Sequence, residues 1–141
     1  MSVTVRTSSE WHELAIRVLI DAGASRANAG FVADALIDAE VDGISSHGLS
    51  RLPAYADQLA SGKINGQAKP EVSRTAASVV SVDARYGFAF PAIAAGIEAA
   101  LPIVRETGVV AVAIGNSHHC GVLGRTVESL ARHNVLALAF S

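Results

Sequence analysis

Residues 109–121 read VVAVAIGNSHHCG, an apolar run that ends in a polar cluster with two adjacent histidines. A β-branched run of this length predicts a buried strand, and the polar residues after it predict a loop that leads into a helix. The carboxyl end of a buried strand is where open α/β sheets place ligand chemistry. We therefore expect a functional site around residues 115–121.

A second polar cluster lies upstream, where residues 45–51 read SSHGLSR. If one helix runs through this segment, His47, Arg51 and Tyr55 recur at every fourth position and share one face. Pro53 favours a later helix start, which places the proline in the first turn, where its missing N–H costs nothing. Arg51 and Tyr55 share one helix face with either start, whereas His47 belongs to the helix only if the helix begins before residue 47.

The residue types in the two clusters suit proton transfer beside a bound carboxylate. His119 lies between a predicted strand and a predicted helix N-terminus, so dry and electropositive surroundings should lower its pKa and keep the imidazole neutral. The planar fork of Arg51 suits both oxygens of a carboxylate, although an isolated arginine more commonly forms a surface ion pair. Tyr55 is expected to pack in the core, and Ser46 either orients His47 or caps a helix.

Three other chemistries do not fit these residues. Gly115, Gly121 and Gly124 lack the Gly-x-Gly-x-x-Gly spacing of a Rossmann turn. The adjacent side chains of His119 and Cys120 point apart, which argues against a cysteine nucleophile. No His-x3-His or similar spacing supports zinc, so no metal site is expected.

Composition limits the class of protein. The 141 residues are 50% hydrophobic and 17% charged, which favours a packed domain over a disordered chain. A formal net charge of −2 without a basic stripe argues against nucleic acid as a partner. No apolar run reaches the ~18 residues of a membrane helix. One cysteine, and the lack of an apolar signal core in residues 1–7, indicate a cytoplasmic protein.

The apolar periodicity divides the chain into two parts. Helices are expected at residues 8–21, 25–42, 51–61, 91–106 and 122–133. Strands are expected at residues 78–83, 109–114 and 135–140. The sequence therefore predicts an α/β fold, with an N-terminal helical region at residues 1–66 and the first part of a layered α/β domain at residues 67–141.

The last residues, 135–141, read VLALAFS and place an apolar run at the end of the chain. Native domains rarely end on an apolar central strand without a polar tail. We therefore expect this sequence to be the front portion of a longer protein, as a fragment or as a truncated product.

The two clusters together resemble the malate/L-lactate dehydrogenase family of the non-Rossmann type, whose relatives act on ureidoglycolate, sulfolactate, diketogulonate and cyclic imino acids. The residues that carry the resemblance are Ser46, His47, Gly48, Arg51 and Tyr55, followed by Asn116, Ser117, His119 and Gly121. Further landmarks are Leu59-x-x-Gly62 and Val82-Asp83-x-x-x-Gly87-x-x-x-Pro91. The resemblance extends from about residue 10 to the last residue and covers less than half of a full-length member.

The resemblance implies hydride transfer between NAD or NADP and a small 2-hydroxy or 2-oxo acid, by a homodimer whose nicotinamide-binding fold is unlike the Rossmann fold. It implies proton handling by His47, assisted by Ser46, and by His119. The implied substrate-binding residues are Arg51 and Tyr55. The residues implied to line the cofactor are His119, Cys120, Gly121, Val122 and Leu123.

Two positions depart from the family pattern and leave the substrate open. Cys120 stands where relatives often carry an aromatic residue, and Arg125 stands where a tyrosine is common. His118 with His119, and residues 87–91 (GFAFP), also suit the reductases of cyclic imino acids. A different alternative is a non-catalytic remnant that folds only with a partner. The rest of the cofactor site would lie beyond the last residue, so we expect this chain alone to be inactive.

Overall fold

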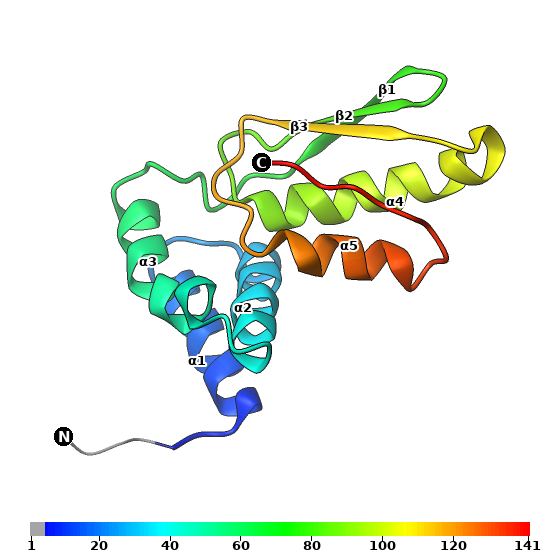
Figure 1. The fold of residues 1–141 in the computed structure, drawn as a ribbon. Helices are drawn as coiled ribbons and strands as arrows, with labels where there is room; N and C mark the ends of the chain where they lie inside the picture. The colour runs from blue at the N-terminus through cyan, green and yellow to red at the C-terminus, as the bar shows by residue number, and fades with distance from the viewer. Residues whose placement is uncertain (1–4) are drawn as a thin grey trace.

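The computed structural model describes residues 5–141; residues 1–4, on which part of the expectation about a secretory signal depends, lie outside the described residues. The N-terminal part consists of α1 (Ser8–Asp21), α2 (Arg26–Val41) and α3 (Leu52–Ala60). The C-terminal part consists of β1 (Glu71–Ala76), β2 (Val79–Asp83), α4 (Ala89–Thr107), β3 (Ala111–Gly115) and α5 (Leu123–Ala131). The fold is α/β, with α1–α3 beyond one end of the sheet and α4 along it (Figure 1).

The helical part has a buried apolar core that extends beyond α1–α3. Leu19, Val32 and Leu36 are fully buried between α1 and α2. Phe88 and Phe90, at the start of α4, belong to the same core. Because burial of one such side chain contributes roughly 1.5–3 kcal/mol of transfer free energy, these phenylalanines hold the sheet unit against the helices. Apolar packing thus crosses the predicted boundary at residue 66, and the two-part division stays a prediction.

The sheet is mixed and has the order β1-β2-β3. β1 and β2 pair antiparallel, with Glu71 opposite Asp83. β2 and β3 pair in parallel, with Asp83 opposite Gly115, and α4 connects them. A helical connection between parallel strands is what the predicted strand–helix–strand pattern requires. The carboxyl ends of β2 and β3 therefore lie side by side, at the end of the sheet that is nearer to the N-terminal helices (Figure 1).

The predicted strand at residues 135–140 is wrong. The segment follows α5 back past α4 toward the sheet but forms no strand (Figure 1). Leu136, Leu138 and Phe140 are 96%, 81% and 87% exposed. A strand of continuous apolar residues needs to be covered on both faces, and the described residues leave its large side chains exposed.

Two other strands also differ from the expectation. Strand β1 is not among the predicted strands, because its residues, EVSRTA, lack the apolar alternation of a half-buried strand. All six residues are exposed in the structure. β3 forms where predicted but is not buried, and only Ile114 among its residues is partly covered. β3 is an edge strand, so one of its sides has no neighbour among residues 5–141. Within the same residues, no helix is long and apolar enough to cross a membrane.

Asn28 should be the most sensitive polar residue of the helical core. Its buried side-chain amide donates hydrogen bonds of 2.9 Å to the carbonyls of Gly66 and Ala68. Asn28→Ala leaves buried acceptors without a donor, which should lower the free energy of unfolding by about 1–3 kcal/mol. Urea denaturation measures this change. The exposed Gln67, which donates similarly to the Gly23 carbonyl, gives the control Gln67→Ala, and an equal loss in both variants would contradict the role of burial.

Candidate active site

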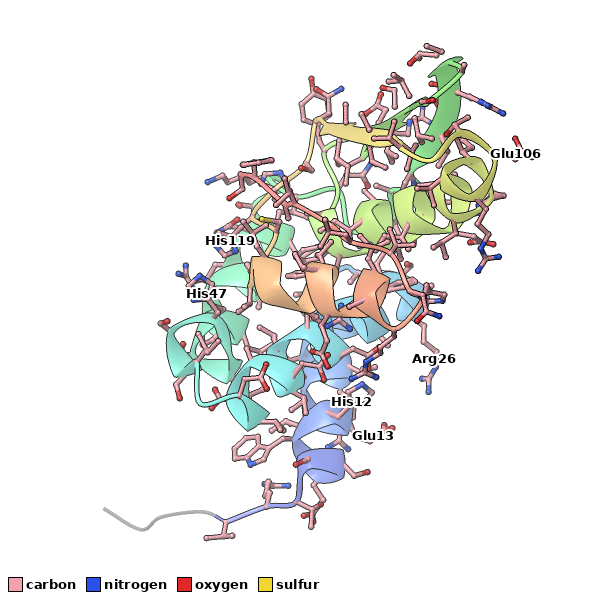
Figure 2. All side chains as sticks on the ribbon, turned by 45° about the vertical axis from the view of Figure 1, so that its right-hand side comes forward. His12, Glu13, Arg26, His47, Glu106 and His119 are labelled. Atoms are coloured by element: carbon pink, nitrogen blue, oxygen red, sulfur yellow. The ribbon has the colours of Figure 1, made fainter. Side chains whose placement is uncertain are left out.

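The structure brings the two sequence clusters together at the carboxyl ends of β2 and β3. His47 lies in a 3₁₀ turn, η1 (Ser45–His47), and His119 lies in the loop between β3 and α5. Their ring centroids are 5.3 Å apart, with an angle of 30° between the ring planes. Figure 2 shows the two imidazoles on the same side of the molecule, where the helices meet the sheet. One small ligand can therefore contact both rings.

The segment that carries His47 is not part of a continuous helix. Turn η1 is followed by Gly48 and by a second 3₁₀ turn, η2 (Leu49–Arg51), which continues into α3. Pro53 then falls in the first turn of α3, as the later of the two predicted starts requires. His47 therefore reaches the site from a turn, whereas Arg51 and Tyr55 reach it from the start of a helix.

Hydrogen bonds fix the tautomer of neutral His119. The backbone N–H of Gly121 donates to His119 Nδ1 at 3.1 Å, and the Tyr55 hydroxyl lies 3.3 Å from the same nitrogen. Because a backbone N–H can only donate, Nδ1 is the acceptor and the proton of the neutral ring is on Nε2. Gly121 has a φ of +70°, and a Cβ at this position would lie 2.8 Å from the Phe90 ring, so the loop needs a glycine here.

The pKa of His119 is lowered from its usual value of 6.5. Partial burial of the ring is the largest cause, and electrostatic interactions with Arg51 and His47 add to it. The predicted lowering of the His119 pKa is thus confirmed. The residue as a whole is exposed, however, and the charged groups that act on it belong to the other cluster and not to a helix N-terminus. At neutral pH the ring is predominantly uncharged, because its pKa lies below the solution pH.

Ser46 connects His47 to Arg51. The Ser46 hydroxyl lies 3.0 Å from His47 Nδ1, and the Arg51 Nε–H donates to the Ser46 carbonyl at 2.7 Å. Within residues 5–141, the terminal nitrogens of Arg51 make no hydrogen bond. One edge of the guanidinium is therefore fixed to the backbone, and the other nitrogens are available to an anionic ligand.

Tyr55 is both a core residue and a site residue. Its ring is 4% exposed and packs edge-on against Phe88, with centroids 5.5 Å apart. Burial raises the pKa of its hydroxyl, with the Arg51 charge acting in the opposite direction. The predicted packing is confirmed, and the neutral hydroxyl also holds His119 in place.

The five residues predicted to line a cofactor, His119 to Leu123, lie along an open hollow of about 1790 Å³ between β3, α4 and α5. This volume exceeds the ~300–1,000 Å³ of typical small-molecule sites. No side chain caps α5, so its first N–H groups are available to anionic atoms. These features fit an elongated ligand with anionic groups, such as a dinucleotide. Residues 5–141 contain no cluster of three or more His, Cys, Asp or Glu side chains that could hold a metal ion.

Sequence reasoning missed the role of Asp83 at the end of β2. Its carboxylate accepts the Arg85 N–H at 2.8 Å and the Asn116 side-chain amide at 3.1 Å. These hydrogen bonds lower the pKa of Asp83 and connect the loops that leave β2 and β3. An aspartate that accepts the N–H two residues later is a known turn signal, so the sequence offered a local clue.

The pKa of His119 should respond to Arg51. Arg51→Met removes a positive charge near the ring, so the pKa of His119 should rise in an NMR titration of the intact protein. Arg17→Met removes the same charge from an exposed position of α1 and serves as the control. A pKa that rises equally in both variants, or in neither, would show that Arg51 does not act on the ring.

Comparison with known proteins identifies relatives of this chain. A family model described as malate/L-lactate dehydrogenase matches residues 7–141. The (2R)-3-sulfolactate dehydrogenase (NADP(+)) of Chromohalobacter salexigens is 55% identical over 132 residues, which are 94% of this chain and 39% of that protein. A Delta(1)-pyrroline-2-carboxylate/Delta(1)-piperideine-2-carboxylate reductase of Pseudomonas putida is 44% identical over 117 residues, which are 83% of this chain and 34% of that protein.

A solved structure gives the same result. The delta1-piperideine-2-carboxylate reductase of Pseudomonas syringae superposes with a TM-score of 0.88 at 36% identity, over 93% of this chain and 40% of that one. The chain thus spans about two fifths of the length of these relatives. The family model covers nearly all of the chain, and the chain belongs to the malate/L-lactate dehydrogenase family.

Proposed function

We propose that the full-length protein is an NAD(P)-dependent oxidoreductase that transfers a hydride between nicotinamide and C2 of a small 2-hydroxy or 2-oxo acid. The observation that carries this proposal is the meeting of two imidazoles, 5.3 Å apart, with an arginine that has free terminal nitrogens. The 55% identity to a protein named (2R)-3-sulfolactate dehydrogenase supports the 2-hydroxy acid class.

Arg51 is proposed to bind the substrate carboxylate. The hydrogen bond from its Nε–H to the Ser46 carbonyl orients the guanidinium plane. Its terminal nitrogens then offer paired donors to the two carboxylate oxygens, a geometry that a lysine cannot reproduce. Binding at this point would place C2 of the substrate near both histidines.

The two histidines are proposed to have different tasks. Neutral His119 presents an Nε2–H, because its Nδ1 is occupied by the Gly121 N–H, and it therefore suits holding a substrate oxygen. His47 can donate its Nδ1–H to Ser46, which leaves Nε2 free to accept the proton of the substrate hydroxyl. When bound, the nicotinamide supplies the acceptor for the hydride that leaves C2.

A second candidate is the reduction of a cyclic imino acid. It is favoured by the 44% identity to a pyrroline- and piperideine-carboxylate reductase and by the structural match to another such reductase. These substrates also carry a carboxylate for Arg51, and a protonated imidazole would supply the proton that the ring nitrogen requires. Assays with sulfolactate, malate, lactate and pyrroline-2-carboxylate distinguish the two reactions.

We further propose that the enzyme acts as a homodimer in the cytoplasm. Residues 5–141 leave the hollow beside the histidines open, and a second subunit, together with the rest of the full-length chain, would help to enclose a cofactor there. A single, partly buried cysteine suits a reducing compartment. Light scattering of the full-length protein tests the dimer.

Arg51→Lys should impair turnover while the protein stays folded. The variant keeps the charge but loses the paired donors, so kcat/KM should fall by the equivalent of about 1–3 kcal/mol of transition-state stabilisation. Steady-state kinetics of the full-length enzyme with each acid measures the loss. Arg17→Lys on α1 is the control. An unchanged kcat/KM with every acid that is turned over would count against the assignment of Arg51.

Replacing the histidines one at a time by asparagine should lower kcat strongly in at least one of the two variants. Proton transfer typically contributes ~10²–10⁴-fold, so losses of this size are expected for at least one of His47→Asn and His119→Asn. His12→Asn, which alters a histidine paired with Asp34 in the helical part, is the control. Circular dichroism verifies folding, and losses of only a few-fold in both site variants would rule out the acid–base role.

A further inference from the structure

We propose that Glu40, in the last turn of α2, is a positioning residue that fixes residues 45–51 and thereby sets where His47 and Arg51 stand relative to His119. The importance of this placement for turnover rests on the proposed function. The contacts of Glu40 themselves are independent of any assignment of substrate or reaction.

The two carboxylate oxygens of Glu40 bind the first residue of each of the two turns. Oε2 accepts a hydrogen bond from the Ser45 hydroxyl at 3.2 Å, at the first residue of η1. Oε1 accepts the backbone N–H of Leu49 at 2.7 Å, at the first residue of η2. One side chain from α2 thus fixes the start of both turns, and His47 lies between the two attachment points.

The bond to Leu49 also takes the place of a helix cap. The residue before η2 is Gly48, which has no side chain that could cap the turn, and η2 continues into α3. A carboxylate at the start of a helical segment is favoured both by the exposed N–H groups and by the helix dipole. Glu40 supplies this carboxylate from another helix, so its bond orients the start of α3, from which Arg51 reaches the site.

Gly48 allows the carboxylate to lie directly against the backbone of the segment. A Cβ at this position would be 2.2 Å from Glu40 Oε1 and 2.6 Å from Cδ. Both atoms belong to a side chain that two hydrogen bonds already hold, so it cannot move aside without breaking them. The glycine and the glutamate therefore form one fitted contact.

Hydrogen bonds within residues 45–51 connect the residues held by Glu40 to Arg51. The Ser50 hydroxyl donates to the Ser45 carbonyl, and the Arg51 Nε–H donates to the Ser46 carbonyl. These bonds connect the two turns of residues 45–51 to each other, so a displacement of one turn should also displace the other. A change of about 1 Å in the position of a catalytic group can lower a rate by ~10²-fold, so the anchor of this unit matters for turnover.

The test combines an NMR signal with kinetics in the full-length protein. Glu40→Ala removes both hydrogen bonds, so the imidazole signals of His47 at fixed pH should shift, while those of His12 in α1 should not. With the acids that the wild type turns over, kcat/KM should fall roughly 10–100-fold. Glu40→Gln keeps an oxygen for Leu49 and an amide that can donate to Ser45, so it should retain most of the wild-type signal positions and activity.

Asp42→Asn is the matched control for charge. Asp42 follows α2 two residues after Glu40, is exposed, and makes no side-chain hydrogen bond within residues 5–141. A shift of the His47 signals in Asp42→Asn as large as in Glu40→Ala would show a long-range effect of charge and overturn the positioning role. Unchanged His47 signals in folded Glu40→Ala would overturn it as well. If the wild type turns over none of the acids, the proposed function fails, while the His47 signals still decide the role of Glu40.

A double-mutant cycle keeps the test valid if Glu40→Ala is poorly folded. Gly48→Ala alone should displace the carboxylate, shift the same His47 signals and lower the free energy of unfolding. With Glu40 already shortened to alanine, the added methyl group has room, so the same Gly48→Ala change should be much less destabilising. Equal destabilisation by Gly48→Ala in both backgrounds would show that the two residues do not form the inferred contact.

Discussion

The hydrogen bonds between the loops that leave β2 and β3 are the constraint on which the rest of the site depends. The Ala84 N–H donates to the Gly115 carbonyl at 3.0 Å, which extends the parallel pairing of the two strands beyond Asp83. The Tyr86 N–H donates to the Asn116 carbonyl at 2.8 Å, although Tyr86 and Asn116 both have positive φ values. Left-handed backbone at such residues persists only where its surroundings hold it, and here each loop holds the other.

This junction determines the direction of both chain segments that build the site. Beyond the β2 loop, Phe88 and Phe90 enter the core of the helical part. Beyond the β3 loop, Gly121 lies so close to Phe90 that a Cβ would be 2.8 Å from the ring. His119 lies 3.3 Å from the hydroxyl of Tyr55, which packs on Phe88. The helices and the sheet are thus connected by aromatic packing at the point where the two imidazoles meet.

The sequence predicted much of this arrangement because its signals are local. Residues 109–114 have a strand pattern, and Pro53 marks a helix start; both are properties of a few neighbouring residues. The strand predicted at residues 135–140 failed for a different reason. A continuous apolar run reports a preference for burial, and whether other layers are present to provide that burial is not a local property.

The contacts that the sequence did not predict join residues far apart in the chain. Glu40 and Leu49 are nine residues apart, with two glycines and the turn η1 between them, and no spacing rule for helices or strands relates them. Tyr55 and His119 are separated by 64 residues. Both residues were candidates for separate reasons, but a hydrogen bond between them requires the folded positions of α3 and β3, which follow from the packing of Phe88 and Phe90.

Arg125, where the sequence analysis expects a tyrosine to be common among relatives, forms an ion pair in the structure. Arg125 Nε lies 2.6 Å from Asp38 Oδ2 and connects α5 to α2, but the two side chains are 38% and 53% exposed. An exposed pair of this kind contributes about 0–1 kcal/mol, whereas one buried phenylalanine contributes roughly 1.5–3 kcal/mol. The ion pair therefore contributes less to this region than the packing of Phe90, against which the loop that carries His119 lies at Gly121. The side chain of Arg125 pairs with Asp38 and is not among the residues that line the hollow, so it lies outside the candidate cofactor site.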